Sequence, residues 1–191
     1  MPRAGLTPAI VTEAGAALAD EIGFAQLSMG LVAERLGVRT PSLYKHVTSQ
    51  ADLVHRIAVQ AANELADDIR DATQGRAGSE AFTAGAQAMR RYVKDHPGRY
   101  AAGNAARPAG PGDPLTAALD RVLASWAAML HGYRIDAGQE IHALRMLRTM
   151  LHGFATLEAA NGFRIDEDVE DSFTWLIDFV DRGLRSLDGF R

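Results

Sequence analysis

Apolar residues recur along this chain every three or four positions, as they do on one face of an amphipathic helix. No segment shows the strict alternation that is typical of a half-buried strand. The first helical face runs from Val11 to Ile22. Thr7 and Pro8 before it are typical of a helix start, and Gly23 after it is typical of a helix end. The pattern therefore predicts an all-α fold.

Two short helices are predicted next. The first covers 29–36, with Ser28 as its cap and Gly37 as its stop. The second covers about 40–46, and Pro41 is acceptable there because it lies in the first turn. The first of these helices has about two turns, and the second is shorter still.

Longer helices are predicted in the rest of the chain. A fourth helix begins with the capping-box pair Ser49 and Asp52 and ends near Thr73. A fifth is stopped by His96 and Pro97, and the stretch 103–114 that follows is rich in glycine and proline, as a mobile loop would be. Three more helices are expected to begin at Asp113 and Pro114, at the cap-and-box pair Asp136 and Gln139, and at Asp166, and to end near 133, 161 and 187.

Composition limits the function classes. With 191 residues, 47% of them hydrophobic, the chain can bury one good core or a small head attached to a larger body. A formal net charge of -4 excludes a global basic field, so any contact with nucleic acid must come from a local patch. The absence of cysteine removes disulfides and thiolate metal sites. No apolar run is long enough for a membrane span or a signal peptide, so we expect a cytoplasmic protein without a membrane partner.

The two short helices are typical of a helix-turn-helix unit, whose second helix enters the major groove of DNA. Gly37 supplies the positive backbone angle of the turn, and the small Ala33 lets the two helices approach closely. The side chains that face outward from the second helix are cations and short hydrogen-bonding groups, which suit phosphates and base edges. The alternative is a solvated helix within a helical body.

The stretch "LSMGLVAERLGVRTPSLYKHVTSQADL", with the preceding "AIVTEAGAALADEIGFAQ", resembles the DNA-binding head of the TetR-like transcriptional regulators. The remainder, with "HPGRYAA" and "LHGFATLE", resembles more loosely the WHG-type body of one branch of that family. The resemblance implies a DNA-binding domain at 1–60 and a ligand-binding and dimerisation domain at 61–191. It also implies a homodimer on an inverted-repeat operator in double-stranded DNA, normally a repressor released by a small-molecule effector.

Motif position places a set of residues where the family contacts DNA, and Arg39 joins them because it faces outward. The set is Ser28, Arg39, Thr40, Pro41, Ser42, Tyr44, Lys45 and His46. Two positions depart from the family's pattern. Gly30 stands where a cation or polar residue is common, and Gln50 stands where a lysine often meets phosphate. Each departure is expected to remove a phosphate contact.

The helix expected at 141–161 has so wide an apolar surface that more than one neighbour must cover it. The last helix also has a second apolar edge. Surplus apolar faces on adjacent helices predict a four-helix interface across a two-fold axis, although an intramolecular bundle could bury the same faces. The predicted dimer-interface residues are Arg145, Thr149, Gly153, Thr156, Trp175 and Phe179.

A mostly apolar effector pocket with a few phenol and indole donors is a further expectation. Taken singly, each of these side chains is more often ordinary core. The predicted lining is Met89, Tyr92, Tyr100, Trp126, Met129 and Tyr133.

Catalysis is not expected. His131, His142 and His152 lack the helical spacing of paired metal ligands, and no nucleophile elbow or phosphate-binding glycine loop is present. The sequence therefore predicts no enzyme, no metal site and no cofactor. The alternative function is a helical ligand-binding or scaffold protein without specific DNA binding.

Overall fold

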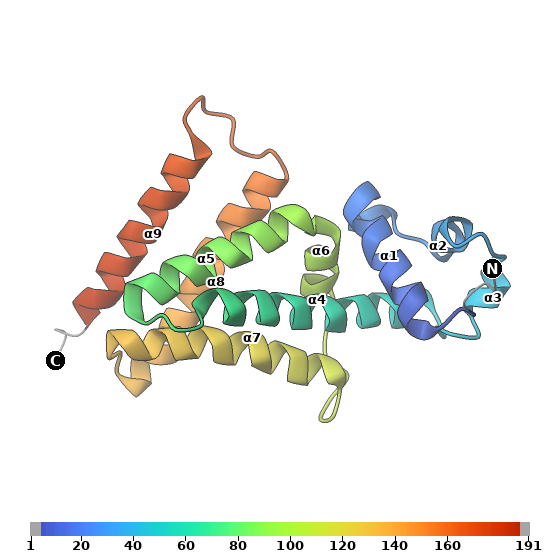
Figure 1. Ribbon diagram of the computed structural model, residues 1–191, viewed down its shortest axis with the longest axis horizontal. Helices are drawn as coiled ribbons and strands as arrows, with labels where there is room; N and C mark the ends of the chain where they lie inside the picture. Colours follow the sequence, from blue (N-terminus) through green and yellow to red (C-terminus); the bar gives the residue numbers. More distant parts are fainter. Residues whose placement is uncertain (1–4, 188–191) are drawn as a thin grey trace. The chain divides into compact units, whose positions relative to one another are not determined.

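The computed structural model describes residues 5–187, which form nine α-helices, two short 3-10 helices and no strand (Figure 1). The all-α fold with a helix-turn-helix head and a long fourth helix is confirmed. The helices are α1 (Pro8–Ile22), α2 (Met29–Arg35), α3 (Thr40–Leu43), α4 (Gln50–Thr73), α5 (Gly78–Asp95), α6 (Pro97–Ala105), α7 (Pro114–Leu130), α8 (Ala137–Ala159) and α9 (Val169–Ser186).

Two predicted boundaries and one predicted cap are wrong. α3 ends at Leu43, and residues 44–46 continue as a turn. α9 begins later than predicted because Asp168, and not Asp166, accepts a hydrogen bond from the amide of Glu170 and caps the helix. α8 begins after Asp136 as expected, but the Asp136 side chain makes no cap hydrogen bond.

The largest error concerns α6. The sequence predicted no helix between His96 and Asp113, because glycine and proline are frequent there. Pro97 in fact occupies the first turn of α6, where its missing N–H costs nothing. The helix continues to Ala105, and a loop precedes α7.

The chain divides into two compact units. One runs from the start of the described chain to Asn63 and also includes Asp95–Ala118, and the other joins Glu64–Lys94 to the segment that begins at Leu119. The chain passes between the units within α4, between α5 and α6, and within α7.

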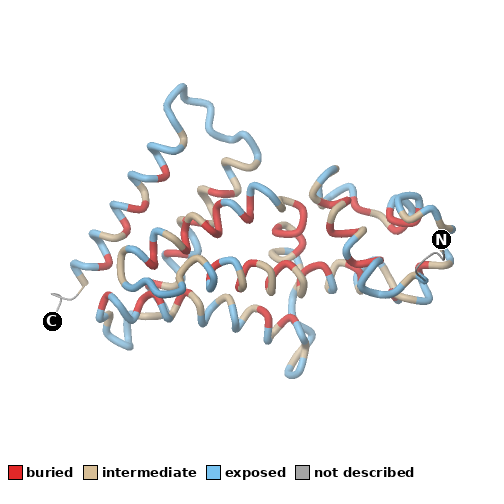
Figure 2. Tube along the Cα trace, in the orientation of Figure 1, coloured by how far each residue is buried: buried red, intermediate tan, exposed pale blue. Residues whose placement is uncertain are grey.

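The first unit has its own core, built from α1, α2, α3, the start of α4 and α6. Val11, Leu43, Leu53 and Ile57 are fully buried in it, and so is Ala102 of α6. α6 therefore contributes to the core of the head (Figure 2).

A close approach fixes α6 on α1. A Cβ atom on Gly98 would lie 2.1 Å from the backbone of Ala19, so only glycine fits there. Beside this contact the backbone amide and the Nε of Arg99 both donate to Asp20, at 2.8 Å each. A second guanidinium nitrogen of Arg99 donates to Glu13 at 2.7 Å. Sequence reasoning missed these partners because they lie far from Arg99 along the chain.

The second unit is a helical bundle that includes α5, α8, α9 and the later turns of α4 and α7. Its fully buried side chains include Phe82 of α5 and Phe173 of α9. Figure 2 shows one buried stripe along α9 and an exposed loop before it. Within the described part of the chain, no helix is long and apolar enough to cross a membrane.

Candidate nucleic-acid interface

The turn between α2 and α3 has a well-defined geometry. Gly37 lies at φ +64°, in the left-handed region that favours glycine. The amide of Gly37 donates to Glu34, and the amide of Val38 donates to Ala33, both at 3.0 Å. These two bonds form a Schellman motif, which ends α2 and aims the chain into α3. The predicted stop at Gly37 is confirmed.

Buried side chains fix the orientation of α3 and of the turn after it. Leu43 and Val47 are completely buried, and they hold α3 and the following turn against the core of the head. The amide of Ser42 donates to the carbonyl of Arg39 at 2.8 Å, which closes the first turn of α3. Ser28 caps α2, because its Oγ accepts from the amide of Leu31 at 3.3 Å.

The residues predicted to contact DNA lie together on α3, on the turn after it and at the start of α2. None is buried, and Tyr44 is 51% exposed. Arg39, Pro41 and Lys45 are exposed, and Ser28, Thr40, Ser42 and His46 are partly exposed. Among the described residues, Arg39 and Lys45 have no acidic partner, so both cations are available to phosphates.

The third cation of this region is not available in the same way. Arg35 donates from both terminal nitrogens to the two carboxylate oxygens of Glu21, each at 2.6 Å. This pair joins the last turn of α2 to the last turn of α1. Arg35 therefore orients the two helices and contributes little positive charge to the reading face.

The start of α4 carries a second positioning contact. The side-chain amide of Gln50 donates to the carbonyl of Leu27 at 2.9 Å, just before the cap of α2. The predicted pair Ser49 and Asp52 also forms in part, since Ser49 Oγ accepts from the Asp52 amide at 3.0 Å. Asp52 reaches back to the amide of Thr48 at 2.8 Å, one residue earlier than in a standard capping box. Burial raises the pKa of Asp52, but the hydrogen bonds from the Thr48 amide and from Arg56 outweigh it, so the pKa lies below its ordinary value.

The six residues predicted to line an effector pocket are all buried. Tyr100 belongs to the first unit, and the other five belong to the second. The phenol of Tyr92 donates to Glu64 at 2.9 Å. The phenol of Tyr133 donates to Asp181 at 2.6 Å, and burial together with this bond raises the pKa of Tyr133. Both hydroxyl groups thus have partners within the second unit.

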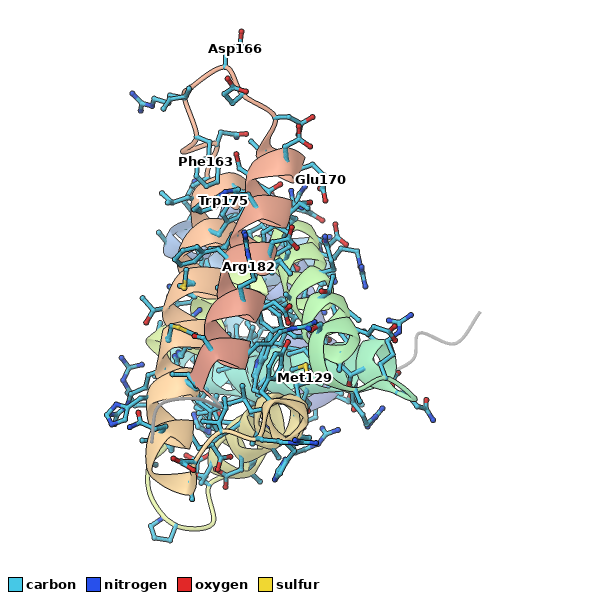
Figure 3. The ribbon with its side chains drawn as sticks, turned by 90° about the vertical axis from the view of Figure 1, so that its left-hand side faces the viewer. Met129, Phe163, Asp166, Glu170, Trp175 and Arg182 are labelled. Carbon is cyan, nitrogen blue, oxygen red and sulfur yellow. The ribbon has the colours of Figure 1, made fainter. Side chains whose placement is uncertain are left out.

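The predicted dimer-interface residues lie on α8 and α9, and none of them is buried. Trp175 is 62% exposed and Phe179 is 53% exposed, and their rings stack at 5.3 Å between centroids. A Cβ atom on Gly153 would meet nothing within 4 Å, so the surface of α8 is open there. Figure 3 shows this face toward the viewer, with Trp175 and Arg182 on α9.

An open groove also lies on the first unit, between α1 and the start of α4. Its charged side chains pair with one another or with neighbours: Arg56 with Asp52, and His55 with Asp113. None of the six residues predicted to bind an effector lines this groove.

Two family models match the chain. One, described as bacterial regulatory proteins of the tetR family, matches residues 11–57 and so covers the helix-turn-helix. The other, described as a tetracyclin repressor-like C-terminal domain, matches residues 82–180.

Two relatives extend the likeness over most of the chain. The uncharacterized HTH-type transcriptional regulator YobS of Bacillus subtilis (strain 168) is 30% identical over 180 residues, which are 92% of this chain and 91% of that protein. The uncharacterized HTH-type transcriptional regulator Rv0681 of Mycobacterium tuberculosis (strain ATCC 25618 / H37Rv) is 33% identical over 168 residues, 87% of this chain and 76% of that protein.

Solved structures share the fold at lower identity. BioQ with its natural double-stranded DNA operator has a TM-score of 0.71 at 18% identity, covering 95% of this chain and 99% of that one. A TetR variant from Acinetobacter baumannii AYE in complex with minocycline has a TM-score of 0.72 at 19% identity, covering 96% and 98%. Taken with the helix-turn-helix geometry, the family models and relatives establish that this chain belongs to the TetR family of DNA-binding transcriptional regulators.

Proposed function

We propose that this TetR-family regulator is a homodimeric repressor that acts in the cytoplasm, binds an inverted-repeat operator and is released from it by a small apolar or aromatic effector. The observation that carries the proposal is the exposed face of α3 and its following turn, which offers two cations and several hydroxyl groups on a rigid frame. We assign DNA reading to residues 1–60 and effector binding and dimerisation to residues 61–191.

The reading face divides into two kinds of contact. Arg39 and Lys45 neutralise phosphates, which gives affinity for any duplex and makes binding depend on salt. Thr40 and Ser42 carry short hydroxyl groups at the start of α3, the end of a reading helix that meets base edges. Pro41 stiffens the first turn between them. The structure of BioQ with its double-stranded DNA operator supports DNA binding by a protein of this fold.

Dimerisation would use the outer faces of α8 and α9. The stacked Trp175 and Phe179 expose more apolar surface than an isolated side chain would. On α8, Leu157 is also 51% exposed, so both helices carry exposed apolar side chains. The same faces from two copies would close a four-helix interface around a two-fold axis, with Gly153 allowing close approach.

An effector would bind inside the body, among Met89, Tyr92, Trp126 and Met129. Their aromatic and thioether groups suit an apolar or aromatic molecule. The neighbouring structure with minocycline supports small-molecule binding by a protein of this fold. Because the phenol of Tyr133 is bonded to Asp181, it contributes its ring to the pocket more readily than its hydroxyl group.

Release from DNA requires only a change in the distance between the two reading helices of the dimer. The reading helices of a dimer must lie about 34 Å apart to enter successive major grooves. α4 starts beside the helix-turn-helix and continues into the second unit, so a swing of this helix would move the head. Suppose that an effector binds the conformation with the wrong spacing about 2.7 kcal/mol more tightly than the DNA-binding conformation. It would then lower operator affinity about a hundredfold.

Selection of bound sites from random duplexes tests the DNA proposal. An enriched inverted repeat supports both sequence reading and two-fold symmetry. Weak binding of all duplexes without enrichment contradicts the proposal, and it favours a ligand-binding or scaffold protein without specific DNA contacts.

Tryptophan fluorescence tests the effector site. The chain has two tryptophans, so a Trp175→Phe variant leaves the buried Trp126 as the single reporter. Compounds that change its emission are then added to the parent protein on its operator, because Trp175 belongs to the proposed dimer face. A compound that both changes the emission of Trp126 and releases the protein from DNA supports the proposed effector site. Inducers that leave the emission of Trp126 unchanged contradict it.

A further inference from the structure

A buried cation lies behind the proposed dimer face. Arg90 of α5 is only 5% exposed, although it carries a permanent charge. The DNA-binding proposal does not use it, and it lies on none of the predicted sites. Its position between α8 and α9 suggests why it is there.

The guanidinium of Arg90 joins the two helices. Its Nε and Nη2 donate to the two oxygens of Glu158, near the end of α8, at 2.6 and 2.8 Å. Its Nη1 donates to Glu170, in the first turn of α9, at 2.5 Å. We call these three residues, Arg90, Glu158 and Glu170, the α5 clasp. Figure 3 shows α9 with Glu170, with α5 on one side and α8 on the other.

Aromatic rings enclose the same guanidinium. Its central carbon lies 4.5 Å from the ring centroid of Phe173 on α9 and 5.8 Å from that of Phe154 on α8. The two rings are 5.0 Å apart, and Phe154 also contacts Phe163 of the connecting loop at 4.8 Å. The clasp therefore lies at the point where α8, the loop and α9 meet.

Only an arginine can make this set of contacts. The planar fork presents several N–H groups in fixed directions and can stack on rings, whereas a lysine ammonium is a compact point charge that cannot form a planar bidentate fork. A buried ion pair is also a poor source of stability, because desolvation of the charges cancels much of their attraction. A geometric role explains the arrangement better than a gain in fold stability.

We propose that Arg90 is a positioning residue for the homodimer: it holds α8 and α9 at the angle at which their outer faces form a single surface for a second copy of this chain. The inference rests on the proposed homodimer. Trp175 and Phe179 on α9 must lie level with Gly153 on α8 for both helices to meet the partner together. Arg90 fixes that register from behind without contacting the partner.

Sedimentation equilibrium of the full chain tests the clasp. We expect Arg90→Lys and Glu158→Gln each to raise the dimer dissociation constant at least about tenfold, because either change breaks the fork. Lys94→Met is the matched control, since Lys94 also contacts Glu158, at 2.7 Å, but is 47% exposed. We expect it to leave the dissociation constant almost unchanged.

A double variant separates position from stability. Arg90→Met with Glu158→Leu replaces the buried pair by apolar side chains, which should keep the free energy of unfolding close to that of the parent. We expect the dimer dissociation constant of this double variant to be raised, as in the single variants. If the double variant, or Arg90→Lys, dimerises as tightly as the parent, the positioning role is wrong. If the parent itself sediments as a monomer, the proposed homodimer fails, and the clasp proposal fails with it.

Discussion

Gln50 shows how a single side chain can take a different role from the one its sequence position suggests. In the related family a lysine at this position often contacts phosphate, so the glutamine was predicted to remove a phosphate contact. In the structure its amide bonds to the carbonyl of Leu27 and ties α4 to the entry of α2. Arg35, the cation nearest to the turn, likewise has a positioning role, since its ion pair with Glu21 joins α2 to α1. Neither partner could be predicted, because both lie well beyond one helical turn in sequence.

On the reading face, we expect phosphate and base contacts to respond differently to substitution. Lys45→Ala should weaken binding to all duplexes and lower the salt slope by about one phosphate contact. Thr40→Ala and Ser42→Ala should change which bases are preferred. Titrations of selected and scrambled duplexes at several salt concentrations measure both effects. The division of roles is wrong if the three variants lose affinity and salt dependence alike.

Gly98 gives a prediction about stability. Gly98→Ala should lower the free energy of unfolding by more than about 3 kcal/mol, because its Cβ would overlap the backbone of Ala19 and backbone cannot move aside cheaply. Gly103→Ala in the same helix is the control. There the nearest atom is 3.9 Å away, so alanine should stabilise α6 by up to about 1 kcal/mol. Urea unfolding compares the two, and equal effects would contradict the close approach.

At the scale of elements, the sequence located helices wherever local signals determine them. The caps Thr7 and Ser28 and the turn at Gly37 act within a few residues, and all three were predicted. α6 was missed because its composition favours a loop and its stability comes from packing on α1. Tertiary contacts override propensity in such segments. The contacts of Arg90 were missed for the same reason, as Glu158 lies 68 positions away.

The ion pair between Arg90 of α5 and Glu158 of α8 should be lost at acid pH. The hydrogen bond from Arg90, helped by Lys94, lowers the pKa of Glu158 below its ordinary 4.5. A carboxylate of this kind stabilises the fold above its ordinary pKa, and the contribution is lost as the pH falls through the lowered value. We therefore expect the free energy of unfolding to decrease below pH 4.5, and to decrease less in Glu158→Gln. Urea unfolding of both proteins at pH 7 and at acid pH measures the difference; parallel curves would contradict it.

At the scale of the whole molecule, the all-α fold class and the helix-turn-helix were predictable from the sequence. The return of residues 95–118 to the first unit was not, because it depends on which distant segments pack together. The predicted dimer face lies on exposed parts of α8 and α9, so a bulky substitution on that face tests whether two copies pair there.

Gly153 offers that test. Gly153→Leu should raise the dimer dissociation constant by overpacking the interface, a cost of about 1–3 kcal/mol. The chain itself leaves this position open, so the helix content of the variant should match the parent. Sedimentation and circular dichroism together check both statements. A Gly153→Leu protein that dimerises like the parent would move the interface elsewhere.

The place of Ala102 in the core of the head has a practical consequence for building hybrid regulators. A fragment cut after the first helices would leave a hole where α6 belongs and would lose the Asp20 partner Arg99. Designers who wish to give this protein's DNA specificity to another sensor should therefore transplant two pieces of chain, the amino-terminal segment and residues 95–118. The junctions would then fall within α4, at the α5–α6 connection and within α7, where the chain already changes from one unit to the other.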